Sequence, residues 1–173
     1  MAISLYDATV ASFIQTVGAA VGFMEKGRAH CAEKGIDLQS VVETRLYPDM
    51  LPFHFQAVCI AHHTQGAIEG VQAGEFAPPP SLSLDYAGLQ KLVADAHAYL
   101  KGLKAEDINV LEGREVIFRL GSNAMPFTAE DFLLTFSMPN LHFHATTAYD
   151  ILRMQGTSLG KRDYLGALRM KRR

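Results

Sequence analysis

Apolar side chains recur at the spacing of one long α-helix over the first 35 residues of this 173-residue chain. Intervals of three and four positions place them along one helix face. The stripe comprises Val10, Phe13, Ile14, Val17, Val21 and Met24. Ser4, followed by Asp7, has the form of a capping box, which marks a helix start. Gly35 ends the run, so the sequence predicts a long first helix.

Two further helices are predicted, separated by a linker rich in proline. Asp49 can cap a second helix, in which Pro52 is tolerated because it falls in the first turn. That helix should run to about Ala73. Residues 76–80 include three consecutive prolines and cannot continue a helix, so they form a semi-rigid linker. Ser83 then begins a third helix.

The apolar period changes from helical to nearly two between residues 113 and 128. Val116, Phe118 and Leu120 alternate with other side chains, and a turn falls at residues 121–123. This pattern predicts a small β-hairpin.

A fourth helix follows the hairpin. Thr128 and Asp131 form a second helix-start signal. Pro139 kinks or restarts this helix just before Asn140, and Gly156 ends it. The predicted fold is therefore mainly all-α, a four-helix bundle with a small β-hairpin between helices 3 and 4.

Length and charge predict one domain with a basic tail. With 49% hydrophobic residues, the chain can fill a single core, which we place in residues 1–166, leaving 167–173 as the tail. Residues 161–173 carry six basic and one acidic residue, a net charge of +5, whereas the remainder carries 10 basic and 17 acidic residues. An acidic body repels a phosphate backbone, so a solvated or subunit-docking tail is favoured over a nucleic-acid arm.

Composition also bears on location. The apolar stretches are interrupted before the ~20 residues that a bilayer span requires, and the N-terminus has no basic region followed by an apolar run. We therefore expect a cytoplasmic protein without a membrane anchor. Cys31 and Cys59 are far apart and form no C-x-x-C motif, so both are expected to be reduced packing residues.

Four of the seven histidines fall in two apolar helical stretches. On a helical wheel, His144 shares an apolar stripe with Leu141 and Ala148, whereas His142 points elsewhere. His63 lies on the stripe of small and polar residues, away from His62. This stripe comprises Gln56, Cys59, Gly66, Ala67 and Gly70. Facing helices can bring His63 and His144 together either as a metal or ligand site or as a buried polar pair.

Four strings carry a resemblance that covers nearly the whole chain. They are Ser4-Leu5-Tyr6-Asp7, Arg45-Leu46-Tyr47-Pro48-Asp49-Met50, residues 143–153 (FHATTAYDILR) and residues 159–166 (LGKRDYLG). The chain resembles the DinB-like (DinB/YfiT-type) four-helix bundles, in an uncharacterised bacterial branch of unknown function.

The resemblance implies a metal site. Metal-binding members present one histidine from the second helix and an H-x-x-x-H pair from the fourth, around a divalent ion such as zinc or nickel. By position these correspond to His63, Asn140 and His144. Asn140 offers a neutral oxygen where a histidine would offer nitrogen, which lowers the affinity for zinc or nickel.

Three functions remain open. The first is a divalent-metal-dependent hydrolase or thiol-type transferase with a degenerate metal site. The second is a non-catalytic bundle that binds a small molecule or a protein. The third is a DNA-associated role, suggested by the basic tail and opposed by the acidic body. Relatives of this kind commonly form homodimers, and the distinctive segment 159–166 beyond the last helix suggests a docking surface.

Overall fold

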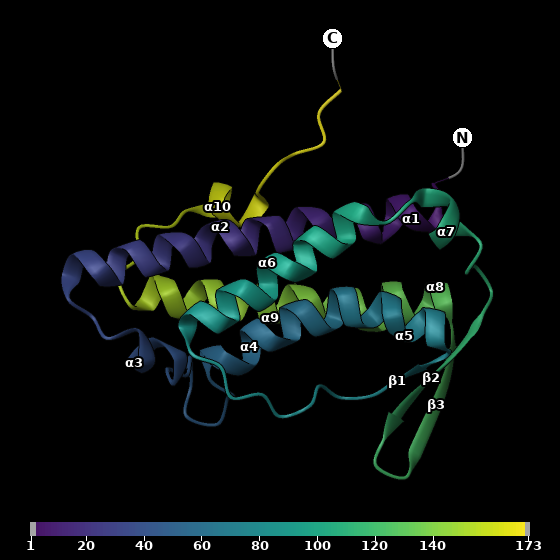
Figure 1. Cartoon of the computed structure of the whole chain (residues 1–173), viewed down its shortest axis with the longest axis horizontal. Coiled ribbons are helices and arrows are strands. Elements are labelled where there is room, and N and C mark those ends of the chain that lie inside the picture. Colours follow the sequence, from purple (N-terminus) through teal and green to yellow (C-terminus); the bar gives the residue numbers. More distant parts are fainter. Residues whose placement is uncertain (1–2, 172–173) are drawn as a thin grey trace.

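Four long helical runs lie side by side in the computed structural model, which describes residues 3–171 (Figure 1). The outermost residues of the predicted domain and tail, 1–2 and 172–173, fall outside the described part. The runs are α2 (Val10–Lys34), α4 (Phe53–Ala61) continued by η1 (His62–Gly66) and α5 (Ala67–Ala73), α6 (Tyr86–Gly102), and η2 (Phe132–Ser137) continued by α9 (Met138–Met154). The predicted four-helix bundle is therefore confirmed.

The predicted first helix is interrupted near its start. Ser4 caps α1 (Leu5–Ala8), because its hydroxyl accepts a hydrogen bond from the amide of Asp7. Thr9 then forms a turn at distorted helical angles, with φ −113° and ψ −75°, and its hydroxyl donates to the carbonyl of Leu5. The prediction of one uninterrupted helix that begins at Ser4 was therefore wrong, because the helix is interrupted at Thr9. Gly35 ends α2 as predicted, in the left-handed conformation at φ 66°.

The second helix begins later than the sequence suggests. Asp49 caps nothing, and Pro52 is the extended residue that precedes α4. A proline disfavours helical geometry in the residue before it, here Leu51, so the helix starts only at Phe53. Its predicted end at Ala73 is confirmed. The third helix likewise starts at Tyr86, capped by Asp85 rather than by Ser83.

Each long run packs against two others, so the bundle closes around one core. α2 contacts α6 and α9, and α4 contacts the same two helices. The Tyr86 side chain is buried in this core, and its hydroxyl donates a hydrogen bond to the Met24 carbonyl at 2.8 Å. Gly27 permits the close approach, because a Cβ there would lie 2.7 Å from the Tyr86 oxygen and 2.8 Å from Leu152. Such a contact would push the helices apart.

A small sheet closes one end of the bundle. The hairpin is confirmed as β2 (Glu115–Leu120) paired antiparallel with β3 (Asn123–Thr128). A third strand, β1 (Glu75–Phe76), pairs in parallel with β2 and starts the segment predicted as linker. Two residues are too few to show a period, so the sequence pattern missed this strand. The short helices are α3 (Leu38–Val42), α7 (Ala105–Asn109), α8 (Ala129–Asp131) and α10 (Lys161–Leu165).

The segment beyond the last long helix docks onto its own chain. α10 lies on α2 (Figure 1). Lys26 pairs there with Asp163 at 2.6 Å, and the side-chain nitrogen of Gln15 donates to the Leu165 carbonyl. The Tyr164 hydroxyl accepts from Thr146 on α9. This intramolecular contact occupies the surface that suggested a subunit interface, so the homodimer stays a prediction without support from this segment.

One helical stretch, Leu5–Lys34, is long and apolar enough to cross a membrane by length and composition alone. The sequence analysis did not identify this stretch, because it considered only uninterrupted apolar runs. Its inward side chains, among them Phe13, Val17 and Phe23, are buried against the other helices, which is the behaviour of a core helix.

Candidate metal centre

Three metal-ligating side chains meet between the second and fourth helical runs. Cys59 on α4, His63 on η1 and His144 on α9 each place one ligand atom within 4.8 Å of the others. The rings of His63 and His144 stack with centroids 5.7 Å apart and an interplanar angle of 11°. All three residues are buried, at 1%, 6% and 8% exposure respectively. The structure thus joins the two predicted histidines and adds Cys59.

The sequence analysis did not include Cys59 among the candidate ligands, although a signal was present. It lies four residues before His63, and residues four apart stand above one another on a helix face. Sulfur and imidazole nitrogen together are the donors that zinc prefers. The sequence pattern alone could not distinguish this pair from tight packing, because the partner histidine comes from a helix 80 residues away.

Both helical runs widen into a π-helix beside the cluster. His62–Gly66 contains His63 itself, and Phe132–Ser137 ends immediately before α9. The Phe136 ring, in the second π-helix, lies 5.6 Å from the His63 ring. Single π-turns occur frequently at functional sites, where they redirect side chains. A helical wheel of constant pitch cannot predict this redirection.

Gln56 orients the His144 ring. Its side-chain nitrogen donates to the Leu51 carbonyl at 2.8 Å, which turns its oxygen toward His144 Nδ1 at 2.7 Å. An amide oxygen only accepts, so Nδ1 carries the hydrogen and Nε2 keeps its lone pair. Metal-binding histidines are typically held in this way, by a second hydrogen bond on the far ring nitrogen.

His63 is a buried base without a partner. Its Nδ1 finds no hydrogen-bonding group among residues 3–171, a situation that costs about 1–3 kcal/mol in a protein interior. Burial, aided by His62 and His144, lowers the pKa of His63 to about 3. Burial likewise lowers the pKa of His144 to about 4. Both rings are therefore neutral at pH 7 and have lone pairs to offer to a cation.

Cys59 completes a donor set that fits a borderline-soft divalent ion. Burial raises the pKa of its thiol to about 12, so the metal-free residue is protonated. Metal coordination deprotonates a thiol even when its own pKa is high. One thiolate and two imidazoles match zinc, as a three-ligand set with room for a fourth group. The unpartnered nitrogen of His63 is the observation that favours this fit.

The described residues 5–165 match a family described as a domain of unknown function, DUF1993. The chain belongs to the DUF1993 family. This DUF1993 protein is also similar to the crystal structure of a DinB family member protein from Shewanella denitrificans. The two share 26% sequence identity at a TM-score of 0.77, over 98% of this chain and 96% of the other. No curated protein matches the sequence.

Asn140 sits one turn before His144 in this DUF1993 protein, as the resemblance implies. Its side-chain nitrogen donates to the Phe136 carbonyl at 2.8 Å, within its own helix. Within the Asn140 side chain, the amide oxygen is therefore the only atom that could bind a cation. The ligand group formed by Cys59, His63 and His144 does not depend on it.

Phenylalanines surround the two buried histidines. Phe55 and Phe143 approach His144 with ring centroids at 5.8 and 5.2 Å, and Phe76 lies 5.8 Å from His63. Such a shell keeps water away and strengthens electrostatic interactions inside it. Phe143 is 56% exposed, so this shell reaches the surface next to His144.

Proposed function

We propose that this DUF1993 protein binds a divalent metal of the zinc type through Cys59, His63 and His144, and uses it as a hydrolase or thiol-type transferase. One observation carries the proposal: three potential ligand atoms lie within 4.8 Å of one another. The buried His63 Nδ1, which has no partner among the described residues, supports it. Asn140 remains an additional candidate ligand through its oxygen.

The chain's own residues define what such a site does. Gln56 holds His144 in one tautomer, and Cys59 would give up its proton on coordinating a metal. When bound, a divalent ion with an open position supplies Lewis-acid chemistry that activates water or a thiol. The Phe55 and Phe143 rings pack against His144 and limit the access of bulk water to it.

A non-catalytic binding bundle is the second candidate. A specific observation favours it: a surface cavity beside His62 is lined by residues that do not include Cys59, His63 or His144. In this alternative the cluster is an interior polar network, and ligand binding takes place elsewhere.

Elemental analysis of untagged protein, purified without chelator, tests the metal proposal. We expect a near-stoichiometric divalent metal that is lost in the His63→Ala/His144→Ala double variant. The matched control is His142→Ala, which removes a histidine from the same helix but outside the cluster, and it should keep the metal. A well-folded wild type that stays metal-free after incubation with zinc would refute the site.

The location of the protein and its partners are also proposals. The acidic body of residues 1–160 opposes nucleic-acid binding. A cytoplasmic homodimer is a further proposal, and sedimentation at micromolar concentration tests the dimer. DNA binding would require a salt-sensitive complex that disappears when residues 169–173 are deleted.

A further inference from the structure

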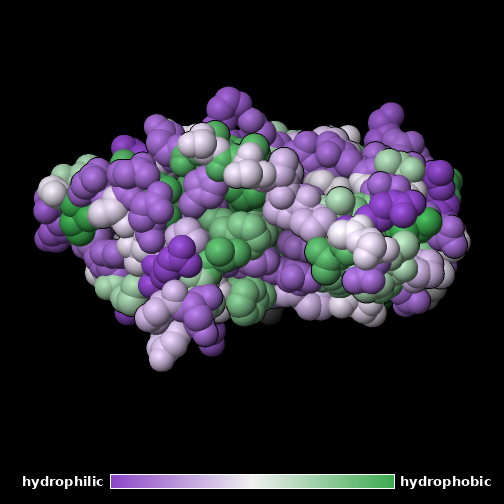
Figure 2. Space-filling model, turned by 90° about the horizontal axis from the view of Figure 1, so that it is seen from below, coloured by the Kyte–Doolittle hydropathy of each residue, from purple (hydrophilic) through white to green (hydrophobic). Residues whose placement is uncertain are grey.

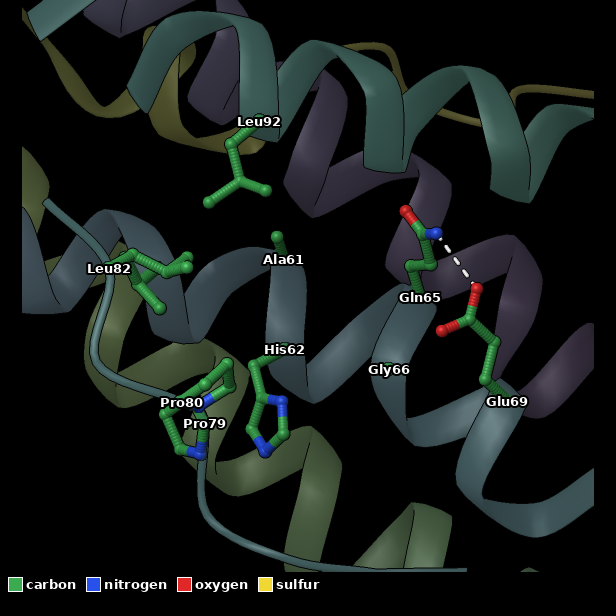
Figure 3. A pocket seen from close by; sticks show the side chains of 10 residues that line it. Ala61, His62, Gln65, Gly66, Glu69, Pro79, Pro80, Leu82 and Leu92 are labelled. Atoms are coloured by element: carbon green, nitrogen blue, oxygen red, sulfur yellow. Dashed lines mark hydrogen bonds between the residues drawn. The ribbon is translucent and has the colours of Figure 1, made fainter. Parts of the chain in front are cut away.

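A cavity opens beside the metal cluster, on the other side of the second helical run. It lies between α4 and η1, the facing side of α6, and the linker that leaves β1 (Figure 3). Its apolar walls are Ala61, Leu92, Leu82, Pro79 and Pro80. The volume is about 170 Å³. An apolar cavity of about 150 Å³ in another protein accommodates benzene, so this space fits a single small ring.

The linker that forms one wall is held at both ends by histidines of the second run. His62 Nε2 donates to the Ala77 carbonyl at 2.8 Å, and the Leu84 amide contacts His54 Nε2 at 3.4 Å. The prolines between these anchors stiffen the segment. In Figure 2, which views the molecule from below, an apolar area lies near the middle of this face among hydrophilic residues. Leu82 of the linker is 37% exposed.

The polar groups of the cavity all offer acceptors. The Gln65 nitrogen donates to one Glu69 oxygen at 2.8 Å, which leaves the Gln65 oxygen and the second Glu69 oxygen free. Because His62 donates through Nε2, the neutral ring keeps Nδ1 as an acceptor. Figure 3 shows the Gln65 and Glu69 side chains together at the end of the cavity opposite the prolines.

The cavity also carries an unbalanced negative charge. Within residues 3–171, Glu69 forms no ion pair, and no lining residue is a lysine or an arginine. A ligand that suits this site therefore brings hydrogen-bond donors and a positive charge on a small apolar body. A primary ammonium group has three N–H donors and no acceptor.

We propose that this cavity binds a small primary amine with an aromatic or cyclic apolar body, its ring against Leu82, Leu92 and the prolines and its ammonium group at Glu69 and Gln65. The site is separate from the metal cluster, and it holds whether or not a metal is bound. It extends the function of this DUF1993 protein beyond the proposed metal chemistry.

Benzylamine is the probe, and its binding is followed by the amide chemical shifts of metal-free and zinc-treated protein in a buffer without phosphate or a primary amine. We expect saturable shifts confined to the cavity lining at millimolar ligand. Benzyl alcohol, which is nearly isosteric but neutral, should bind more weakly. The Glu69→Gln variant should weaken benzylamine binding by about fivefold, the upper end of the range for an exposed ion pair. The control Glu106→Gln removes an exposed acidic residue on α7 and should change nothing.

Filling the space tests the same site independently of charge. Ala61→Leu places a larger side chain in the cavity and should abolish the shifts, provided that thermal unfolding shows an intact fold. Equal affinity for benzylamine and benzyl alcohol, an unchanged Glu69→Gln variant, or no saturable shift in wild type would each overturn the proposal. Because the lining excludes Cys59, His63 and His144, loss of metal binding leaves these outcomes unaffected.

Discussion

Neighbouring histidines on the same helices have opposite surroundings. His63 and His144 are buried and face one another, whereas His62 donates to the linker at Ala77 and the exposed His142 lies 3.3 Å from the Tyr164 hydroxyl. One residue along a helix rotates a side chain by about 100°. That rotation separates a candidate metal ligand from a residue that holds a surface segment in place.

The two pairs also differ in how their polar atoms are satisfied. His62 has a carbonyl partner and stacks on Phe76 at 4.3 Å, while His63 Nδ1 has none in the described part of the chain. Buried nitrogen without a partner is costly, and a fold retains it more readily where a ligand supplies the missing interaction. The contrast therefore points to function in the buried pair and to scaffolding in the other.

Acid should destabilise the metal-free protein through the buried pair, which is the largest expected effect. Their pKa values of about 3 and about 4 lie below the unfolded value of 6.5. Between pH 6.5 and 4 the unfolded chain binds protons that the native chain does not, so stability present above pH 6.5 is lost as the pH falls. At pH 5 the loss is about 2 kcal/mol per histidine.

Urea unfolding at pH 7 and pH 5 measures this loss. The His63→Ala/His144→Ala variant should show about 4 kcal/mol less pH dependence than wild type. The His142→Ala variant is the control, since carboxylates titrate in all three proteins. Identical pH dependence in wild type and the double variant would remove the contrast between the two pairs.

Removing Cys59 should weaken metal binding next most strongly. Cys59→Ser replaces a thiolate with a hydroxyl, and each ligand carries on the order of 3 kcal/mol of a zinc site's binding free energy. We expect zinc affinity to fall by about 100-fold in competition with a chromogenic chelator. Cys31→Ser, at the other buried thiol, should leave the affinity unchanged. An equal loss in both variants would assign the effect to packing.

Gln56 should influence the site through His144. Gln56→Ala removes the acceptor for Nδ1–H, and loss of such an outer partner lowers metal affinity by about 10-fold to 100-fold. Gln56→Glu keeps an acceptor oxygen and should restore the affinity, as measured by calorimetric titration with zinc. Failure of the glutamate to rescue a folded variant would show that an acceptor oxygen at position 56 is not sufficient to hold His144.

His62 should have the smallest effect. His62→Ala removes the hydrogen bond to Ala77, which is worth about 1 kcal/mol of folding free energy. Zinc affinity should stay within about threefold of wild type, because His62 lies outside the ligand group. Chelator competition and urea unfolding on the same preparation measure both quantities. A large loss of zinc would place His62 in the site and erase its difference from His63.

The sequence by itself determined the helical runs, the hairpin and the inward faces that carry His63 and His144, because periodicity, caps and breakers act over a few residues. The break at Thr9 and the start at Phe53 depend on local signals that the helical pattern did not resolve. The strand Glu75–Phe76 escaped it, since its pairing with β2 depends on a distant segment. The two π-helices and the Gln56 hydrogen bond escaped it for the same reason. Only the tertiary structure decided that Cys59 joins the histidines, because which buried side chains share one space depends on how α4 and α9 pack.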